Sequence, residues 1–154
     1  MRVRQIAALV AAGALVSALY IGCGVKSPPI PPEDARPERI LDLDAVSVPT
    51  GIELTWGRPE RYSSGATLRD LGSFVVMRQS QGELQKIADV PVTDTQRFQV
   101  QREFSFIDKT AQIGQAYHYL VTARTTDGYE SLSSNDASAV RVVPQPPPNP
   151  DTFV

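Results

Sequence analysis

The sequence is poor in the residues that build disulfide frameworks, zinc clusters and acid–base catalytic sites. Its 154 residues include one cysteine, Cys23, and one histidine, His118. A single thiol excludes an intramolecular disulfide and any cysteine-based zinc cluster. The formal net charge is −2, whereas nucleic-acid binders are typically basic, so we expect no nucleic-acid partner. The length favours one folded domain with appendages.

Motifs for catalysis, phosphate binding and metal binding are also missing. A catalytic histidine needs a nucleophile and an orienting partner, and no Gly-x-Ser-x-Gly motif accompanies His118. No glycine-rich loop followed by lysine offers a phosphate cradle. Asp42 and Asp44 would share one strand face, but calcium takes about six to eight oxygen ligands. We therefore predict a protein without enzymatic activity, metal or cofactor, with His118 on a solvent-facing surface.

The N-terminus has the pattern of an export signal. Arg2 and Arg4 precede an uncharged, mostly apolar run over residues 6–21, and Gly22 follows. A basic start, a short apolar run and a small residue before the cleavage point are typical of secretory signals. The run has 16 residues, fewer than the about 20 of a membrane-spanning helix. An uncleaved membrane anchor is therefore the less favoured alternative.

The residues around the cysteine resemble a lipoprotein box. Residues 19–23 read Leu-Tyr-Ile-Gly-Cys, with the glycine and cysteine of the bacterial lipoprotein family and a tyrosine where that family prefers leucine. The resemblance implies removal of residues 1–22, diacylation of the Cys23 sulfur and, usually, acylation of its nitrogen. Two or three acyl chains hold a protein firmly on a membrane. Gly24, in place of aspartate, implies by family analogy the outer membrane of a two-membrane bacterium.

Prolines mark the boundaries of the expected domains. Five lie between Pro28 and Pro37 and five between Pro144 and Pro150, against three in the region between. Proline-rich segments form extended, semi-rigid spacers. We therefore predict a lipidated stalk over residues 23–37, a folded domain over residues 38–143 and a proline-rich tail over residues 144–154.

Apolar side chains recur at every second position along several short segments of the middle region. Ile52, Leu54 and Trp56 are one such series, and Tyr117 and Tyr119 begin another. A period of two indicates half-buried strands, and no helical period is sustained after Cys23. The predicted strands are Leu41–Val48, Gly51–Trp56, Ser73–Arg78, Leu84–Val90, Arg102–Asp108, Ala116–Arg124 and Ala137–Val143. Seven short strands in about 100 residues predict an all-β, immunoglobulin-like sandwich.

The folded region resembles a fibronectin type III domain of the bacterial kind. The pieces that carry the resemblance are Leu54-Thr55-Trp56 with Pro59, Leu71 with Phe74 and Val76, Phe106-Ile107-Asp108, Gly114 with Tyr117, Tyr119, Val121 and Ala123, and Asp127-Gly128 with Ser131, Ser134 and Asn135. The resemblance implies that Trp56 is the core tryptophan and that Tyr117 forms a tyrosine corner at the penultimate strand.

Two loops supply candidate interaction residues. The loop between the second and third predicted strands carries Arg58, Arg61 and Tyr62, and the loop between the last two strands carries Tyr129. In the fibronectin type III fold both loops lie at one pole. Tyrosine and arginine are enriched among residues that dominate binding energy. We expect this pole on the side of the stalk, facing the membrane, and the tail at the opposite pole.

The chain ends in Thr152, Phe153 and Val154. A threonine two residues before a terminal aliphatic residue resembles the ligands that PDZ domains capture by strand addition and carboxylate binding. These three residues are therefore a candidate docking motif.

These features favour one function and leave two alternatives. The favoured function is a lipid-anchored cell-envelope protein that presents one fibronectin type III module as a non-catalytic interaction or spacer unit. Its partners would be the membrane and another envelope protein. Residues 23–29 also resemble the start of a small lipoprotein family that assists assembly of the lipopolysaccharide translocon, which would make the stalk the working part. The other alternative is a carbohydrate-associated module that binds through Tyr62 and Tyr129.

Overall fold

The computed structural model describes residues 31–98 and 102–143. The predicted signal, Cys23 and the motif formed by Thr152, Phe153 and Val154 lie outside the described residues. The elements follow in the order β1 (Asp44–Val48), β2 (Gly51–Gly57), β3 (Leu71–Ser80), β4 (Glu83–Pro91), α2 (Asp94–Phe98), β5 (Glu103–Asp108), β6 (Ala116–Thr125) and β7 (Ala137–Val140). All seven predicted strands are confirmed.

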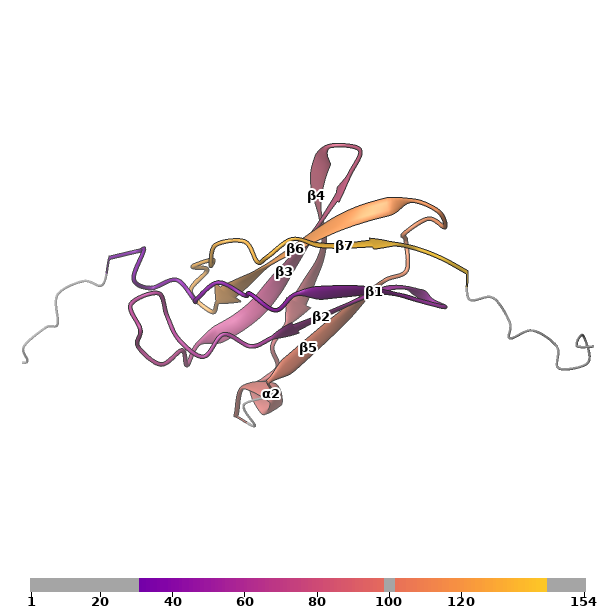
Figure 1. Cartoon of the computed structure of the whole chain (residues 1–154). Coiled ribbons are helices and arrows are strands. Elements are labelled where there is room, and N and C mark those ends of the chain that lie inside the picture. Colours follow the sequence, from indigo (N-terminus) through magenta and orange to yellow (C-terminus); the bar gives the residue numbers. More distant parts are fainter. Residues whose placement is uncertain (1–30, 99–101, 144–154) are drawn as a thin grey trace, which may run out of the picture.

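The strands form two antiparallel sheets that pack face to face (Figure 1). One sheet has the order β1-β2-β5 and the other the order β4-β3-β6-β7. The pairing sets buried residues opposite one another, with Trp56 facing Phe104 in the first sheet and Val76 facing Val121 in the second. The predicted all-β sandwich is therefore confirmed.

The core consists of the side chains that alternation assigns to the inner faces. Ile52, Leu54 and Trp56 of β2 are at most 1% exposed. The Trp56 ring meets the ring of Phe74 from the other sheet edge to face, with centroids 5.4 Å apart. Burying an apolar side chain of this size stabilises the fold by about 1.5–3 kcal/mol. The expected core role of Trp56 is confirmed.

The expected tyrosine corner is present as well. Tyr117 is buried at the start of β6, and its hydroxyl accepts a hydrogen bond from the backbone N–H of Gln112 at 3.0 Å. The next inward-facing residue of the strand, Tyr119, donates its hydroxyl to Asp108 Oδ2 at 2.9 Å, and Arg78 Nη1 donates to the same oxygen at 2.9 Å. Because Asp108 ends β5 of one sheet and the other two residues belong to the second sheet, this buried polar cluster ties the sheets together.

The first and last strands of the chain are shorter than predicted because side chains from distant segments take over their backbone groups. β1 begins three residues later than predicted: the N–H of Leu43 donates to Asn135 Oδ1 at 2.9 Å, and Asn135 Nδ2 donates to Leu43 O at 2.8 Å. β7 ends three residues earlier than predicted, and beyond its end the N–H of Val142 donates to Ser47 Oγ at 2.9 Å.

Helix α2 is an element that the sequence period did not predict. A capping box begins it, in which the N–H of Thr93 donates to Gln96 Oε1 at 2.9 Å and the N–H of Gln96 donates to Thr93 Oγ1 at 3.3 Å. Its five residues are too few to display a helical period. Over residues 31–98 and 102–143, no helix has the length and apolar character needed to cross a bilayer.

Residues 31–37 are not the extended spacer that their prolines predict. They form a turn and then pair with the loop between β2 and β3. The N–H of Ser63 donates to Arg36 O at 2.8 Å, and Pro37 is buried and forms an isolated β-bridge with Tyr62. The end of the predicted stalk is therefore fixed on the sandwich, because its backbone finds hydrogen-bond partners there.

Candidate functional site

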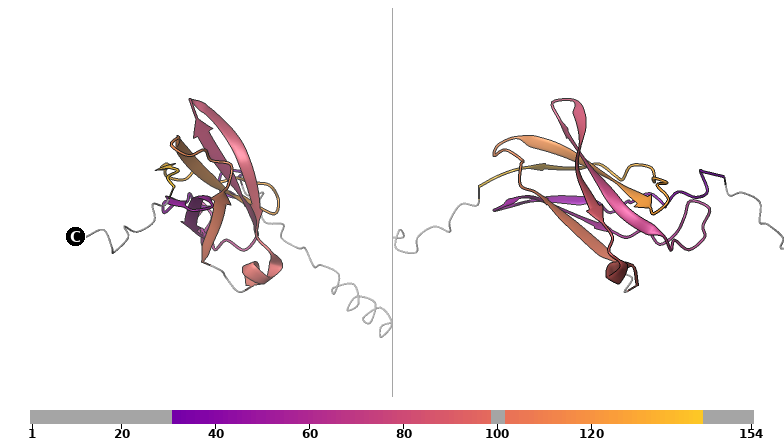
Figure 2. Two further views of the ribbon diagram at one scale, coloured as in Figure 1. Left: turned by 90° about the vertical axis from the view of Figure 1, so that its right-hand side faces the viewer. Right: turned by 180° about the vertical axis from the view of Figure 1, so that it is seen from behind.

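One end of the sandwich gathers the predicted interaction loops and the first described residues of the chain. The β2–β3 loop (residues 58–70) and the β6–β7 loop (residues 126–136) leave the sheets at this end, and residues 31–43 run beside them (Figure 1, Figure 2). The N–H of Glu38 donates to Arg61 O at 2.9 Å. The C-terminal end of the described chain lies opposite. The end with the two loops is termed the N-terminal pole.

Tight turns shape the two loops. The N–H of Tyr62 donates to Ala66 O and the N–H of Gly65 donates to Tyr62 O, both at 2.8 Å. Gly65 has a φ of +85° and Gly128 a φ of +91°, a backbone conformation that glycine adopts without a steric penalty. The turns thereby set Tyr62 and Tyr129 at the surface of the N-terminal pole.

Tyr62 and Tyr129 line one groove of about 490 Å³ together with Asp34, Asp70 and Asp127. This tyrosine groove has a polar anchor, because the Tyr62 hydroxyl donates to Asp70 Oδ1 at 2.5 Å. Burial, followed by the bond to Asp70, raises the pKa of Tyr62 to about 12, so this hydroxyl is protonated at neutral pH. Aromatic walls combined with carboxylates suit a ligand with an apolar face and hydroxyl or ammonium donors.

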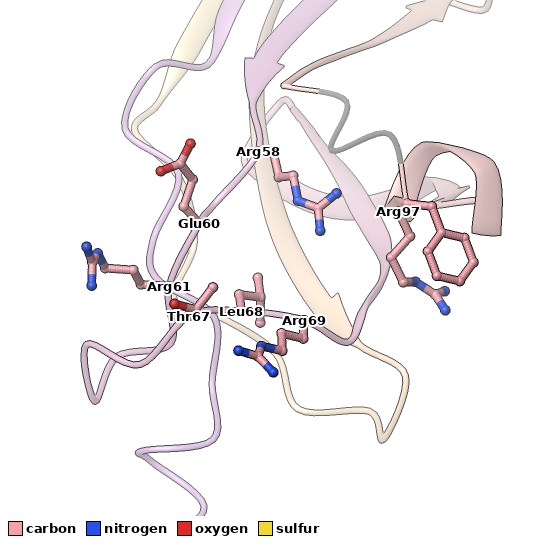
Figure 3. A pocket seen from close by; sticks show the side chains of 8 residues that line it. Arg58, Glu60, Arg61, Thr67, Leu68, Arg69 and Arg97 are labelled. Atoms are coloured by element: carbon pink, nitrogen blue, oxygen red, sulfur yellow. The ribbon is translucent and has the colours of Figure 1, made fainter.

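The two predicted arginines lie in a separate pocket of about 510 Å³, between the β2–β3 loop and α2 (Figure 3). This arginine pocket is lined by Arg58, Glu60, Arg61, Thr67, Leu68, Arg69, Arg97 and Phe98. Arg58 and Arg97 extend into the pocket, whereas Arg61 points away and its Nη1 donates to the carbonyl of Gly65 at 2.8 Å. Burial, followed by the charge of Arg97, lowers the pKa of Arg58.

The structure thus divides the four predicted loop residues into two pairs, and it adds residues that sequence reasoning missed. Asp70 joins the tyrosine groove, and Arg69 and Arg97 join the arginine pocket. Arg69 and Asp70 lie in a loop without a period, so no pattern singles them out. Arg97 comes from α2, and the one signal for this helix is the Thr-x-x-Gln capping box before it.

The remaining polar candidates are held at the surface. His118 lies on the exposed side of β6, as predicted, with Nδ1 2.9 Å from Oδ2 of the exposed Asp136. Asp42 does not share a strand face with Asp44; it precedes β1, and its Oδ1 accepts a hydrogen bond from the N–H of Gly57 at 3.0 Å. In the part of the chain that the structure describes, no three His, Cys, Asp or Glu side chains are placed to hold a metal ion.

Solved structures resemble the described sandwich, although neither a protein-family model nor a curated protein matches the chain. A β-1,2-glucanase from Parabacteroides distasonis is 18% identical, with a TM-score of 0.50 over 77% of this chain and 14% of that chain. The twitchin kinase region from C. elegans (Fn31-NL-kin-CRD-Ig26) is 13% identical, with a TM-score of 0.50 over 70% of this chain and 17% of that chain. The chain folds as a fibronectin type III sandwich. An Fn3-like protein from Clostridium thermocellum is 22% identical, with a TM-score of 0.47 over 73% of this chain and 98% of that chain.

The likeness extends to the fibronectin type III fold alone. Both matches at a TM-score of 0.50 are below 25% identity, and this chain spans only about a seventh of the glucanase chain and a sixth of the twitchin chain. A shared fold does not carry function with it, because function depends on the residues placed on the fold. The activities named for those proteins are therefore not evidence for the function of this chain.

Proposed function

We propose that this protein is lipid-anchored in the bacterial cell envelope and presents one fibronectin type III module as a non-catalytic interaction or spacer unit. The observation that carries this proposal is the position of residues 31–37. The chain that leads from the predicted lipid attachment site, Cys23, joins the sandwich at the N-terminal pole, beside the tyrosine groove. In this proposal the chain therefore enters the domain from the anchor at the same end as the candidate site.

The docking of residues 31–37 limits how far the module stands from the membrane. Only seven residues, Gly24 to Ile30, separate the predicted lipid attachment site from the fixed segment. The eight residue steps from Cys23 to Pro31 reach at most about 29 Å when fully extended, at up to about 3.6 Å each. Residues 24–37 as a polyproline spacer would have reached roughly 43 Å, at about 3.1 Å each. The N-terminal pole is therefore expected close to the bilayer.

The partnering of the polar side chains supports a module without a catalytic step. Inside the fold, Arg78 balances the charge of Asp108, and hydrogen bonds from Arg78, Thr110 and Tyr119 engage both of its carboxylate oxygens. Burial, followed by the hydrogen bond to Asp70, raises the pKa of the Tyr62 hydroxyl and opposes its ionisation. These groups stabilise the sandwich, and the exposed side chains at the N-terminal pole are left for recognition.

The anchor is tested by mass spectrometry of the mature protein from membranes, with Cys23→Ser as the perturbation and Ser27→Ala as the matched control. We expect the parent protein and Ser27→Ala to begin at an acylated cysteine and to fractionate with outer membranes. Cys23→Ser is expected to lack acyl mass and to retain residues 1–22. A native protein that begins at Met1 with an unmodified thiol would refute the anchor.

The envelope partner is tested by photo-crosslinking in intact cells. A photoreactive residue at position 129 reports on the N-terminal pole, and the same residue at the exposed position 109, just after β5 at the opposite end, is the control. We expect a discrete adduct with an envelope protein from position 129 and none from position 109. Equal yields of the same adduct from both positions would contradict the proposal that the N-terminal pole binds the partner.

The tyrosine groove also favours a second candidate, a carbohydrate-associated module. Tyr62 and Tyr129 offer ring surface there, and Asp34, Asp70 and Asp127 offer acceptors for sugar hydroxyls. A glycan array probed with the parent protein, Tyr129→Ala and Tyr129→Phe tests it. This function predicts binding that is lost in Tyr129→Ala and kept in Tyr129→Phe, whereas binding that survives Tyr129→Ala contradicts it.

A further inference from the structure

Three of the arginines that line the arginine pocket come from opposite ends of the β2–β3 loop and from α2. Arg58 follows β2, Arg69 precedes β3 and Arg97 belongs to α2, and in Figure 3 the Arg58 side chain extends toward the side of the pocket on which Arg97 lies. Each guanidinium is a planar fork of N–H donors that matches the oxygens of phosphate and carboxylate groups. We propose that the arginine pocket binds the phosphate group of a phosphate monoester.

Arg97 is oriented mainly by neutral acceptors, so its charge is available to a ligand. Its Nε donates to Leu71 O at 3.1 Å and its Nη2 to Val92 O at 3.4 Å. Its carboxylate contact within the described residues is Asp94, at 3.2 Å, and that side chain is 80% exposed. Exposed ion pairs of this kind contribute little. The fold therefore holds the guanidinium in place without neutralising it.

Arg58 and Arg69 are short of hydrogen-bond acceptors. Arg58 is half-buried, and its Nη1 reaches Gln96 O only at 3.5 Å. Over residues 31–98 and 102–143, the guanidinium of Arg69 has no hydrogen-bond or ion-pair partner. Glu60 is the carboxylate of the pocket lining, and it extends away from Arg58 in Figure 3. The lowered pKa of Arg58 reflects the same deficit, because burial and the charge of Arg97 disfavour its charged form.

A phosphate monoester would supply, in both charge and shape, the hydrogen-bond acceptors that the arginines of the pocket lack. It carries about −1.5 to −2 charges at neutral pH and three strong acceptor oxygens, whereas a carboxylate offers two coplanar oxygens and one charge. Phe98 also lines the pocket and is 84% exposed, so it offers apolar surface to the rest of the ligand. A soluble phosphate monoester and the headgroup of phosphatidic acid both present this group. The site stands independently of the lipid anchor proposed above.

Titration calorimetry of the full chain in a zwitterionic detergent, with glycerol 3-phosphate as the probe, tests the site. Arg58→Gln and Arg69→Gln are each expected to weaken binding about tenfold, because each removes charge-assisted hydrogen bonds. Arg36→Gln is the matched control, because this exposed arginine at the same pole does not line the pocket, and it is expected to change the affinity less than about twofold. Saturable binding that is equal in all four proteins, or the absence of saturable binding, would overturn the proposal. Melting temperatures confirm that each variant is folded.

Further probes identify the source of the phosphate. Dihexanoyl phosphatidic acid that binds at least tenfold more tightly than glycerol 3-phosphate, with the gain lost in Phe98→Ser, assigns the site to a lipid headgroup. Equal affinity of the two probes assigns it to a soluble phosphorylated compound, and either result supports the phosphate site. An acidic peptide without phosphate that binds as tightly as glycerol 3-phosphate, and in the same Arg58-dependent manner, would overturn the phosphate assignment.

Discussion

Asp108 is the buried carboxylate on which the two sheets meet, and its replacement by asparagine gives the sharpest test of the fold. The residue is 2% exposed. Its Oδ2 accepts hydrogen bonds from the Tyr119 hydroxyl and from Arg78 Nη1, both at 2.9 Å, and its Oδ1 accepts from Thr110 Oγ1 at 2.7 Å. Asp108→Asn keeps the shape of the side chain but leaves the largely buried Arg78 guanidinium without a counter-charge.

The expected loss of stability follows from this geometry. Removing one partner of a buried ion pair costs about 3–5 kcal/mol. Asparagine retains one acceptor oxygen, so we expect the lower end, about 3 kcal/mol, from a domain stability of about 5–15 kcal/mol. Each kcal/mol shifts the melting temperature of a domain of this size by about 4–8 °C. Asp108→Asn is therefore expected to melt roughly 12–24 °C lower than the parent protein.

The same carboxylate makes the free energy of unfolding depend on pH. Burial by itself raises the pKa of Asp108, but the hydrogen bonds from Thr110, Arg78 and Tyr119 outweigh it, and the pKa lies below the ordinary value of 3.8. The unfolded chain therefore takes up this proton at a higher pH than the folded chain does. The stabilisation is complete above about pH 4 and is lost as the pH falls through the folded-state pKa.

Urea unfolding of the full chain at pH 7 and at stepwise lower pH measures both effects. Asp136→Asn is the matched control, because that carboxylate is exposed and its loss is expected to change the free energy of unfolding by less than about 0.5 kcal/mol. Below pH 4, Asp108→Asn should lose less stability than the parent protein. A destabilisation under about 1 kcal/mol, or identical pH profiles in the two proteins, would show that the cluster does not hold the sheets together.

Three further changes probe the tyrosine corner, a loop turn and the tyrosine groove. Tyr117→Phe removes the acceptor of the Gln112 N–H and is expected to cost about 1–2 kcal/mol in urea unfolding; an unchanged midpoint would contradict the role of the corner. Gly128→Ala places a side chain at a φ of +91° and is expected to cost about 1 kcal/mol, which thermal melting measures. Ultraviolet titration is expected to show Tyr62 ionising at about 12, and Asp70→Asn should move this pKa toward its ordinary value near 10. Because the folded-state pKa is raised, the stabilisation is present below about pH 10 and is lost as the pH rises through the folded value.

The strands of this protein could be predicted because each buries one face. In β2, Ile52, Leu54 and Trp56 occupy every second position and are all buried, so the period of the sequence is also the period of the packing. The strand ends could not be predicted in the same way. Leu43 leaves the strand because it pairs with Asn135, 92 residues away, and a local pattern contains no information about such a partner.

The sequence could predict at which pole of the sandwich the candidate site lies, but not how its side chains are arranged there. The sandwich topology brings Tyr62 and Tyr129 to one groove although they lie far apart in the sequence. Arg61, the residue next to Tyr62, turns instead toward its own loop carbonyl at Gly65. Side-chain directions in an irregular loop follow its individual hydrogen bonds rather than a period. The position of Arg97 could be predicted only together with the short helix α2. A capping box precedes this helix, but the helix is too short to show a helical period.

In the proposed setting, anchor and recognition are coupled through the docked residues 31–37. The hydrogen bond from the Ser63 N–H to Arg36 O holds this segment on the β2–β3 loop, where Asp34 and Ala35 line the tyrosine groove. The same loop supplies most of the lining of the arginine pocket. The chain from Cys23 to Pro31, which spans at most about 29 Å, then keeps the docked segment near the bilayer surface, where membrane-bound partners and lipid headgroups are at high local concentration. Had these residues remained extended, the sites would have been free to turn away from the membrane. By fixing the orientation of the N-terminal pole toward the membrane, the docked segment thus restricts which partners can reach the two sites.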